Sequence, residues 1–233
     1  MLYPIAYLTV ALLILLPVPA SATAVDEDQP GGWYMFTFNK DLSESRLGFQ
    51  GDVQYRTWDG SGDLEQLLLR GGITYRPDAL PGKYTLGLAN ITSGQFGDSK
   101  QTRTENRTYQ EAVIPQRVWQ KGFLKHRFRF EQRWVNGQDF RTRLRYALFA
   151  NVPLNRPDLS PGAFYLALYN EIFINGERDI GGGAEVDFYD RNRLYGALGY
   201  KFSNTGHIQV GFMQQHTNVV NKGQFQLSLH YNF

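Results

Sequence analysis

The last eleven residues, Gly223 to Phe233, have the sequence GQFQLSLHYNF. Every second residue from Phe225 to Phe233 is aromatic or leucine, and the residues between them are glutamine, serine, histidine and asparagine. Successive side chains of a strand point to opposite faces of a sheet. This stretch therefore predicts a strand with one wholly apolar face and one wholly polar face.

The same alternation recurs upstream of the C-terminus. In residues 125–134 and 140–148, aromatic and aliphatic side chains alternate largely with arginine, and similar patterns occupy residues 47–56, 194–202 and 207–212. Segments of about ten residues with one apolar and one polar face are typical of transmembrane β-barrels. Lipid offers no partner to backbone polar groups, so such a sheet has to close on itself. We therefore predict an all-β protein, an antiparallel transmembrane β-barrel.

A coarse reading of the pattern gives eleven candidate strands, near residues 33–40, 46–58, 65–76, 83–92, 106–118, 122–135, 140–152, 163–174, 191–202, 207–217 and 223–233. Single-chain bacterial barrels normally have an even number of strands. Within a range of 10–12 strands we therefore expect ten, if residues 33–40 lie outside the barrel, or twelve, if Glu177–Asp190 hides another. With the C-terminus in the periplasm, the long connections at 93–105 and 175–190 fall outside and the short turn at 203–206 falls inside.

Composition limits the classes of function. The 233 residues carry a net charge of +2, which gives no indication of a nucleic-acid partner, and 15% of them are aromatic, which argues against a disordered chain. Cysteine is absent from the sequence. Disulfides, thiolate metal sites and cysteine nucleophiles are therefore excluded.

The N-terminal segment has the features of an export signal. Residues 5–16 form an apolar run that is too short to cross a bilayer and is followed by two prolines and several small residues. We expect residues 1–24 to be a signal peptide, removed after Ala22 or Ala24, and residues 25–233 to form one barrel domain. An uncleaved helical anchor is the alternative, because no lysine or arginine precedes the apolar run.

Several short stretches together resemble a known family. They are Gly32-Trp33-Tyr34, residues 126–134 (HRFRFEQRW), 143–146 (RLRY), 170–173 (NEIF), 190–193 (DRNR), 198–200 (LGY) and the closing strand. This set resembles a bacterial outer-membrane barrel family known only as a domain of unknown function. The resemblance implies a barrel in the bacterial outer membrane, and it brings no activity, cofactor or catalytic residue.

The final strand also resembles the terminal strands that outer-membrane barrels present to the barrel assembly machinery. Phe233 is the last residue, and Tyr231 and Leu229 share its face. We expect these three residues to act as the assembly signal. The partners expected for the chain are therefore outer-membrane lipid and the assembly machinery, while a soluble ligand cannot be assigned from the sequence.

One row of basic residues is the strongest chemical feature. Between Lys121 and Arg145 the sequence has eight lysines or arginines and two acids. Phe128, Phe130, Leu144 and Tyr146 should face lipid, so the residues of opposite parity should face the lumen. These residues, here called the basic row, are Lys125, Arg127, Arg129, Arg133, Arg141, Arg143 and Arg145. Their candidate acidic partners are Glu131, Glu111, Glu171 and Asp52.

The basic row has two interpretations. Side chains fill small barrels, whereas 16–18 strands leave an aqueous channel. With ten to twelve strands we favour an Arg/Glu network that fills the lumen of a non-catalytic protein with a structural or envelope-interaction role. A narrow anion-preferring channel for small solutes is the alternative.

Enzymatic and metal-binding functions have weaker support. His216 should face lipid near a rim, as in lipid hydrolases of the outer membrane, but those enzymes have a serine two residues further on and this chain has Asn218. A lipid-modifying enzyme is thus the lowest alternative, and we assign no catalytic residue. Acidic residues of the 175–190 connection could bind a divalent cation. Since they match no metal-binding spacing, we expect a solvated loop and no metal or cofactor.

Overall fold

The computed structural model describes residues 28–42, 45–60, 62–97, 100–118 and 123–233. The predicted signal peptide lies outside these residues. The described part contains eleven strands: β1 (Gly31–Asp41), β2 (Leu47–Thr57), β3 (Leu64–Tyr75), β4 (Lys83–Gly94), β5 (Thr102–Arg117), β6 (Phe123–Val135), β7 (Arg141–Pro153), β8 (Phe164–Asn175), β9 (Tyr189–Lys201), β10 (Gly206–His216) and β11 (Asn221–Asn232). No helix in the described part of the chain is long and apolar enough to cross a membrane.

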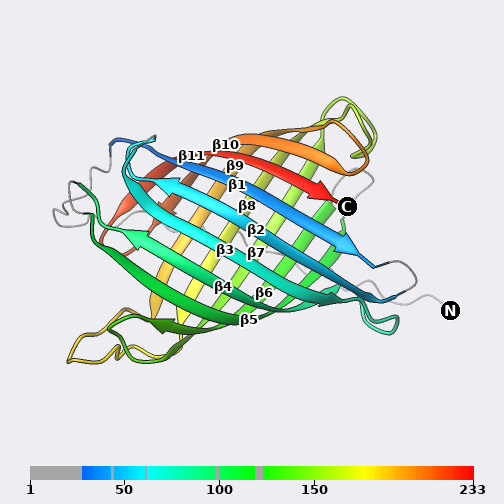
Figure 1. The fold of residues 1–233 in the computed structure, drawn as a ribbon. Coiled ribbons are helices and arrows are strands. Elements are labelled where there is room, and N and C mark those ends of the chain that lie inside the picture. Colours follow the sequence, from blue (N-terminus) through cyan, green and yellow to red (C-terminus); the bar gives the residue numbers. More distant parts are fainter. Residues whose placement is uncertain (1–27, 43–44, 61, 98–99, 119–122) are drawn as a thin grey trace.

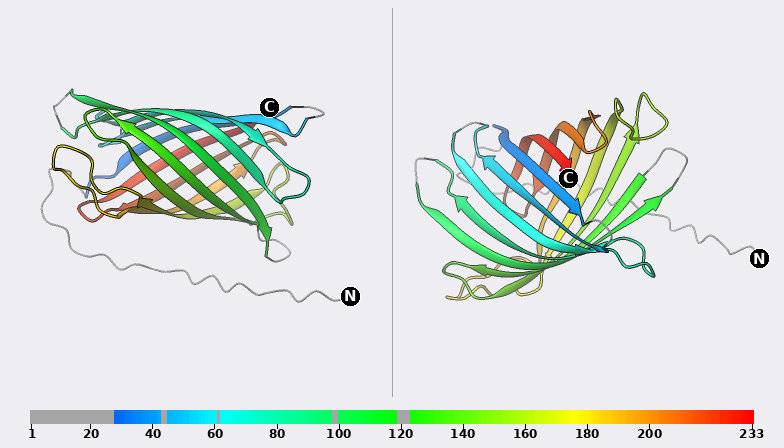
Figure 2. Two further views of the ribbon diagram at one scale, coloured as in Figure 1. Left: turned by 90° about the horizontal axis from the view of Figure 1, so that it is seen from below. Right: turned by 45° about the vertical axis from the view of Figure 1, so that its right-hand side comes forward.

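The strands form one closed barrel in which each strand is hydrogen-bonded to two neighbours (Figures 1 and 2). Consecutive strands pair antiparallel, and the barrel closes where β1 pairs in parallel with β11, from Gly31 opposite Gln224 to Asn39 opposite Asn232. The all-β fold is confirmed, and the barrel is antiparallel apart from this one pair.

The expectation of an even strand number was wrong. The strand predicted at residues 33–40 belongs to the barrel, and the segment 177–190 adds only an isolated bridge between Asp179 and Glu185. An odd number of consecutive antiparallel strands leaves the first and last strand pointing the same way. A parallel ladder then satisfies both edges, because parallel strands also pair their backbone groups in full.

The two ends of the barrel differ in their connections. One end, here called the C-terminal end, carries the end of β11 and the connections 42–46, 76–82, 118–122, 154–163 and 202–205. The opposite end carries the start of β1 and the connections 58–63, 95–101, 136–140, 176–188 and 217–220. The segment 176–188 is the longest. The connection expected at 93–105 is shorter, since β4 and β5 extend to Gly94 and Thr102, whereas 154–163 has the length predicted between the strands at 140–152 and 163–174.

Apolar side chains cover the outside of the barrel and polar side chains line the inside. In β11, Phe225 is 62% exposed and Gln224 is 1% exposed, and the alternation continues through Leu227 and Leu229 against Gln226 and Ser228. A protein surrounded by water would place these faces the other way round. Inside, one apolar cluster lies on the wall formed by β8–β10 and β1: Trp33, Tyr165, Ala167, Tyr195, Ala197 and Met213.

Two lumen-facing glycines let large rings lie flat on the inner wall. A Cβ at Gly87 would be 2.3 Å from the ring of Tyr109, and one at Gly199 would be 2.1 Å from the ring of Tyr165. Both tyrosines lie on the neighbouring strand, directly opposite their glycine. Any other residue would push these rings toward the lumen centre, so the glycines determine how much space remains there.

Candidate functional site

The basic row faces the lumen, as its parity predicted. Arg129, Arg133, Arg141, Arg143 and Arg145 are buried, whereas the alternating residues Phe128, Phe130 and Leu144 are exposed on the outside. Strands β6 and β7 pair in register, so Arg129 lies opposite Arg145 and Arg133 lies opposite Arg141. Positive charges that lie this close in a buried wall repel each other and require carboxylates between them.

Glu131 is the centre of this arrangement and is 1% exposed. Its Oε2 accepts hydrogen bonds from Nε and Nη2 of Arg143 at 2.9 and 2.7 Å, and its Oε1 accepts one from Nη1 of Arg145 at 2.7 Å. Arg107 and Arg129 lie 3.7 and 3.9 Å from the same oxygen. One carboxylate therefore compensates several guanidinium groups.

Glu171 and Glu111 continue the network on both sides of Glu131. Glu171 Oε1 accepts hydrogen bonds from Arg127 at 2.6 Å and from Arg145 at 2.9 Å, so Arg145 bridges two carboxylates. Glu111 pairs with Arg129 and also accepts a hydrogen bond from Gln50 of β2 at 2.8 Å. All three predicted glutamates thus bind residues of the basic row.

The fourth predicted acid has a different partner. Asp52 accepts a hydrogen bond from Nε of Arg70 on the adjacent strand β3 at 2.8 Å, and no ion pair between Asp52 and the basic row occurs among the described residues. Lys125 and Arg141 of the basic row likewise make no ion pair with any described residue. Among the described residues, these two members of the basic row are therefore not bound by a carboxylate.

Two carboxylates of the network were missed by the sequence reading. Glu105 accepts hydrogen bonds from both Arg107 and Arg133, with the Nε distances both at 2.5 Å, and Asp190 accepts one from Arg143 at 2.6 Å. The predicted strand began at residue 106, which left Glu105 in a loop. Its parity matches that of Arg107 and Glu111, and this signal could have identified it.

Two aromatic rings extend the network along the lumen wall. Arg56 of β2 and Arg193 of β9 lie over the indole of Trp33 from β1, at 3.7 and 5.2 Å from its ring centroid. Arg193 also lies 4.8 Å from the ring of Phe173, which Arg145 contacts at 4.3 Å. Contacts therefore join side chains of β1, β2, β7, β8 and β9 inside the barrel.

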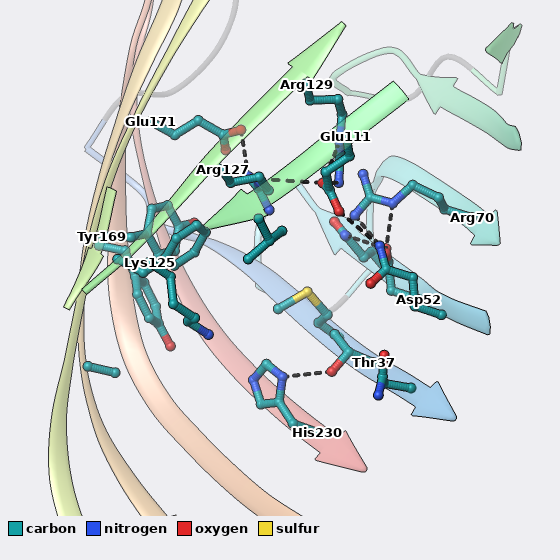
Figure 3. Close-up of a pocket in the computed structure, with 18 of the residues that line it drawn as sticks. Thr37, Asp52, Arg70, Glu111, Lys125, Arg127, Arg129, Tyr169, Glu171 and His230 are labelled. Atoms are coloured by element: carbon teal, nitrogen blue, oxygen red, sulfur yellow. Dashed lines mark hydrogen bonds and ion pairs between the residues drawn. The ribbon is translucent and has the colours of Figure 1, made fainter. Parts of the chain in front are cut away.

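An open cavity of about 1320 Å³ occupies the lumen. Its lining runs from Arg76, Gly82 and Asn232 near the C-terminal end to Gln66 and Ser93 near the opposite ends of β3 and β4. None of the described residues in the connections at the opposite end contributes to the lining. Figure 3 shows Lys125, Arg127 and Tyr169 on one side of this cavity, with Thr37 and His230 across from them.

His216, Leu229 and Phe233 lie apart from the lumen, whereas Tyr231 also lines the edge of the cavity. His216 Nδ1 is hydrogen-bonded to Asn221 Oδ1 at 2.5 Å, while the Thr217 hydroxyl donates to the carbonyl of Val220. Leu229 and Phe233 are exposed on the outer face, and the Tyr231 and Phe233 rings pack edge to face at 4.8 Å. The described part of the chain has no group of three or more side chains suited to hold a metal ion.

Acidic residues of the 176–188 connection attach it to the barrel instead. Glu177 accepts hydrogen bonds from the backbone N–H and the hydroxyl of Thr142, and the backbone bond in particular lowers the pKa of its carboxyl below the ordinary value. Asp187 accepts a hydrogen bond from Asn218 at 2.6 Å. The carboxylates therefore attach this connection to β7 and to the 217–220 connection.

Fold and site together define a closed β-barrel with a charge-paired lumen wall and a cavity inside it. The chain belongs to the family described as "Protein of unknown function (DUF2490)", whose model matches residues 30–226. The resemblance seen in the sequence is thus confirmed at the level of the family. No significant match was found among curated proteins or among solved structures.

Proposed function

We propose that this protein is an integral barrel of the bacterial outer membrane with a non-catalytic role, structural or in contact with other envelope components, and that its lumen does not conduct solutes. The observation that carries the proposal is the buried ion-pair network on the lumen wall. Its central part is a continuous hydrogen-bonded chain of Glu131, Arg145 and Glu171 on the adjacent strands β6, β7 and β8.

The outer surface supports membrane insertion. Large apolar side chains are exposed on the outer face of every strand except β5, among them Ile73, Leu86, Leu88, Leu144, Leu198, Val210 and Phe225. Soluble monomers rarely expose contiguous apolar surface on this scale. Outer-membrane lipid would bury this belt, and the exposed Phe233 would be available to the barrel assembly machinery.

The ion-pair network supports the absence of conduction. Its arginines reach from the wall into the lumen and are held there by Glu131, Glu171 and Glu111. Separating a buried, hydrogen-bonded ion pair typically costs several kcal/mol. We therefore expect these side chains to stay in the lumen and to narrow it.

A narrow anion-preferring channel is the second candidate, because the cavity lining is strongly basic. Among the described residues, fifteen lysines and arginines line the cavity against three carboxylates, Asp52, Glu111 and Glu171. A wall of one charge sign raises the local concentration of counter-ions. Catalysis is not part of the proposal, since His216 is bonded to an amide and not to a serine or threonine hydroxyl.

Two measurements test the proposal. The protein should fractionate with the outer membrane and should migrate faster on an unboiled SDS gel than after boiling, because a closed barrel resists the detergent. Reconstituted in a planar bilayer, the unmodified protein should show no steady conductance. A soluble periplasmic protein would contradict the membrane assignment, and stable anion-selective conductance would make the protein a channel.

A further inference from the structure

The part of the cavity near the C-terminal end contains basic and polar side chains that the ion-pair network does not use. They are Lys125 of β6, His207 of β10, His230 of β11 and Thr37 of β1, here called the mouth cluster. All four residues line the cavity, and Figure 3 shows Lys125 across from Thr37 and His230. Strands β10, β11 and β1 are neighbours and β6 is not, so closure of the barrel places Lys125 opposite the other three.

Lys125 supplies an uncompensated positive charge. Its Nζ makes no hydrogen bond or ion pair with any described residue. It lies over the ring of Phe149, 5.6 Å from the ring centroid. The three carboxylates of the cavity lining are already bound to arginines: Asp52 to Arg70, Glu111 to Arg129, and Glu171 to Arg127 and Arg145. No acid of the lining is thus left to neutralise Lys125.

The two histidines present a second polar group to the same space. Their rings stack with centroids 4.4 Å apart and an interplanar angle of 12°. His230 Nδ1 is hydrogen-bonded to the Thr37 hydroxyl at 2.7 Å and its Nε2 is buried, so His230 supports the stack. His207 makes no hydrogen bond with a described residue and is the imidazole that a ligand in the cavity can reach. A neutral imidazole offers one N–H donor and one acceptor nitrogen. The charge of Lys125 acts on both rings.

An apolar wall lies beside the mouth cluster. The ring of Tyr165 contacts His207 edge to face at 6.0 Å. Met35, Leu159 and Tyr169 pack against the cluster that contains Trp33 and Tyr165, and all of these line the cavity. A charged site next to an apolar wall is suited to a ligand with both characters.

We propose that the cavity binds an organic anion whose carboxylate or phosphate is held by Lys125 and His207 and whose apolar body lies on the wall of Tyr165, Tyr169 and Leu159. The ammonium and an imidazole N–H are donors for charge-assisted hydrogen bonds. The volume exceeds the roughly 300–1,000 Å³ of most small-molecule pockets. The proposal is independent of whether the lumen conducts, because binding is measured on the protein in micelles and not as transport.

The test uses 4-phenylbutyrate as the probe, measured by calorimetry on the purified protein in neutral detergent micelles. The neutral isostere 4-phenylbutanol shows partition into the micelle, and acetate shows the contribution of the anion alone. We expect 4-phenylbutyrate to bind at least about tenfold more tightly than either, because only this probe satisfies both the cluster and the wall. Equal affinity for 4-phenylbutyrate and 4-phenylbutanol would overturn the proposal.

Matched lysine variants locate the site. Lys125→Gln should weaken binding at least about tenfold through loss of a charge-assisted hydrogen bond. Lys100→Gln, at the opposite end of the barrel and outside the cavity lining, should leave the affinity within about twofold. Lys125→Arg keeps the charge and should retain binding within about threefold, and His207→Gln should weaken it at least about threefold. Unchanged affinity in Lys125→Gln, with the heat-dependent gel shift intact, would refute the site.

Discussion

Replacing Glu131 by glutamine is the most direct test of the lumen network. The carboxylate accepts three hydrogen bonds of 2.7–2.9 Å from Arg143 and Arg145. The substitution leaves both guanidinium groups buried, but Arg143 keeps Asp190 at 2.6 Å and Arg145 keeps Glu171 at 2.7 Å. Removing one partner of a buried pair typically costs about 3–5 kcal/mol, and these remaining partners place the expected loss near the lower value, about 3 kcal/mol.

The free energy of unfolding is measured by urea titration in lipid vesicles, followed by tryptophan fluorescence and by the heat-dependent gel shift. Glu185→Gln is the matched control, because Glu185 pairs with Arg178 at 3.0 Å while its side chain is 63% exposed. A pair of this kind contributes about 0–1 kcal/mol. The double variant Glu131→Gln/Arg143→Gln should recover at least about 1.5 kcal/mol relative to the sum of the single variants. Equal losses for Glu131→Gln and Glu185→Gln, or simple additivity, would show that the network does not stabilise the barrel.

Three further predictions concern the outer face, the terminal strand and the long connection. Leu144→Arg on the outer face should cost roughly 2–4 kcal/mol of unfolding free energy if this position lies near the bilayer midplane, while Leu154→Arg in the 154–163 connection should be nearly neutral; equal effects would contradict a membrane wall. Tyr231→Ala combined with Phe233→Ala should reduce the heat-shifted fraction in cells, and an unchanged fraction would remove these rings from the assembly signal. Folding lowers the pKa of Glu177, so its contribution to stability is present above its ordinary pKa and disappears as pH falls through the lowered value. The amide resonance of Thr142 should therefore titrate with a midpoint below 4.5 in wild type and should not titrate in Glu177→Gln. A midpoint at or above 4.5 would contradict the hydrogen bond.

The lumen network shows how far parity alone can predict a site. The basic row and its inward direction followed from the sequence, because Arg129 and Arg143 alternate with Phe130 and Leu144. The choice of partners did not follow. Asp52 has inward parity but lies beside Arg70, while Glu105 was lost through a strand boundary misplaced by a few residues. Pairing depends on which strands are neighbours and on their register, and neither is a property of one segment.

Alternation with a period of two determined the eleven segments, the two faces and the all-β class, since the direction of a strand side chain is set locally by the backbone. Barrel closure was decided only in the tertiary structure. Whether β1 and β11 meet depends on the curvature and twist accumulated over all the strands between them, so the parallel pair could not be read from either segment. The cavity has the same origin, because Lys125, His230 and Thr37 lie on β6, β11 and β1 and face one another only once the sheet has closed.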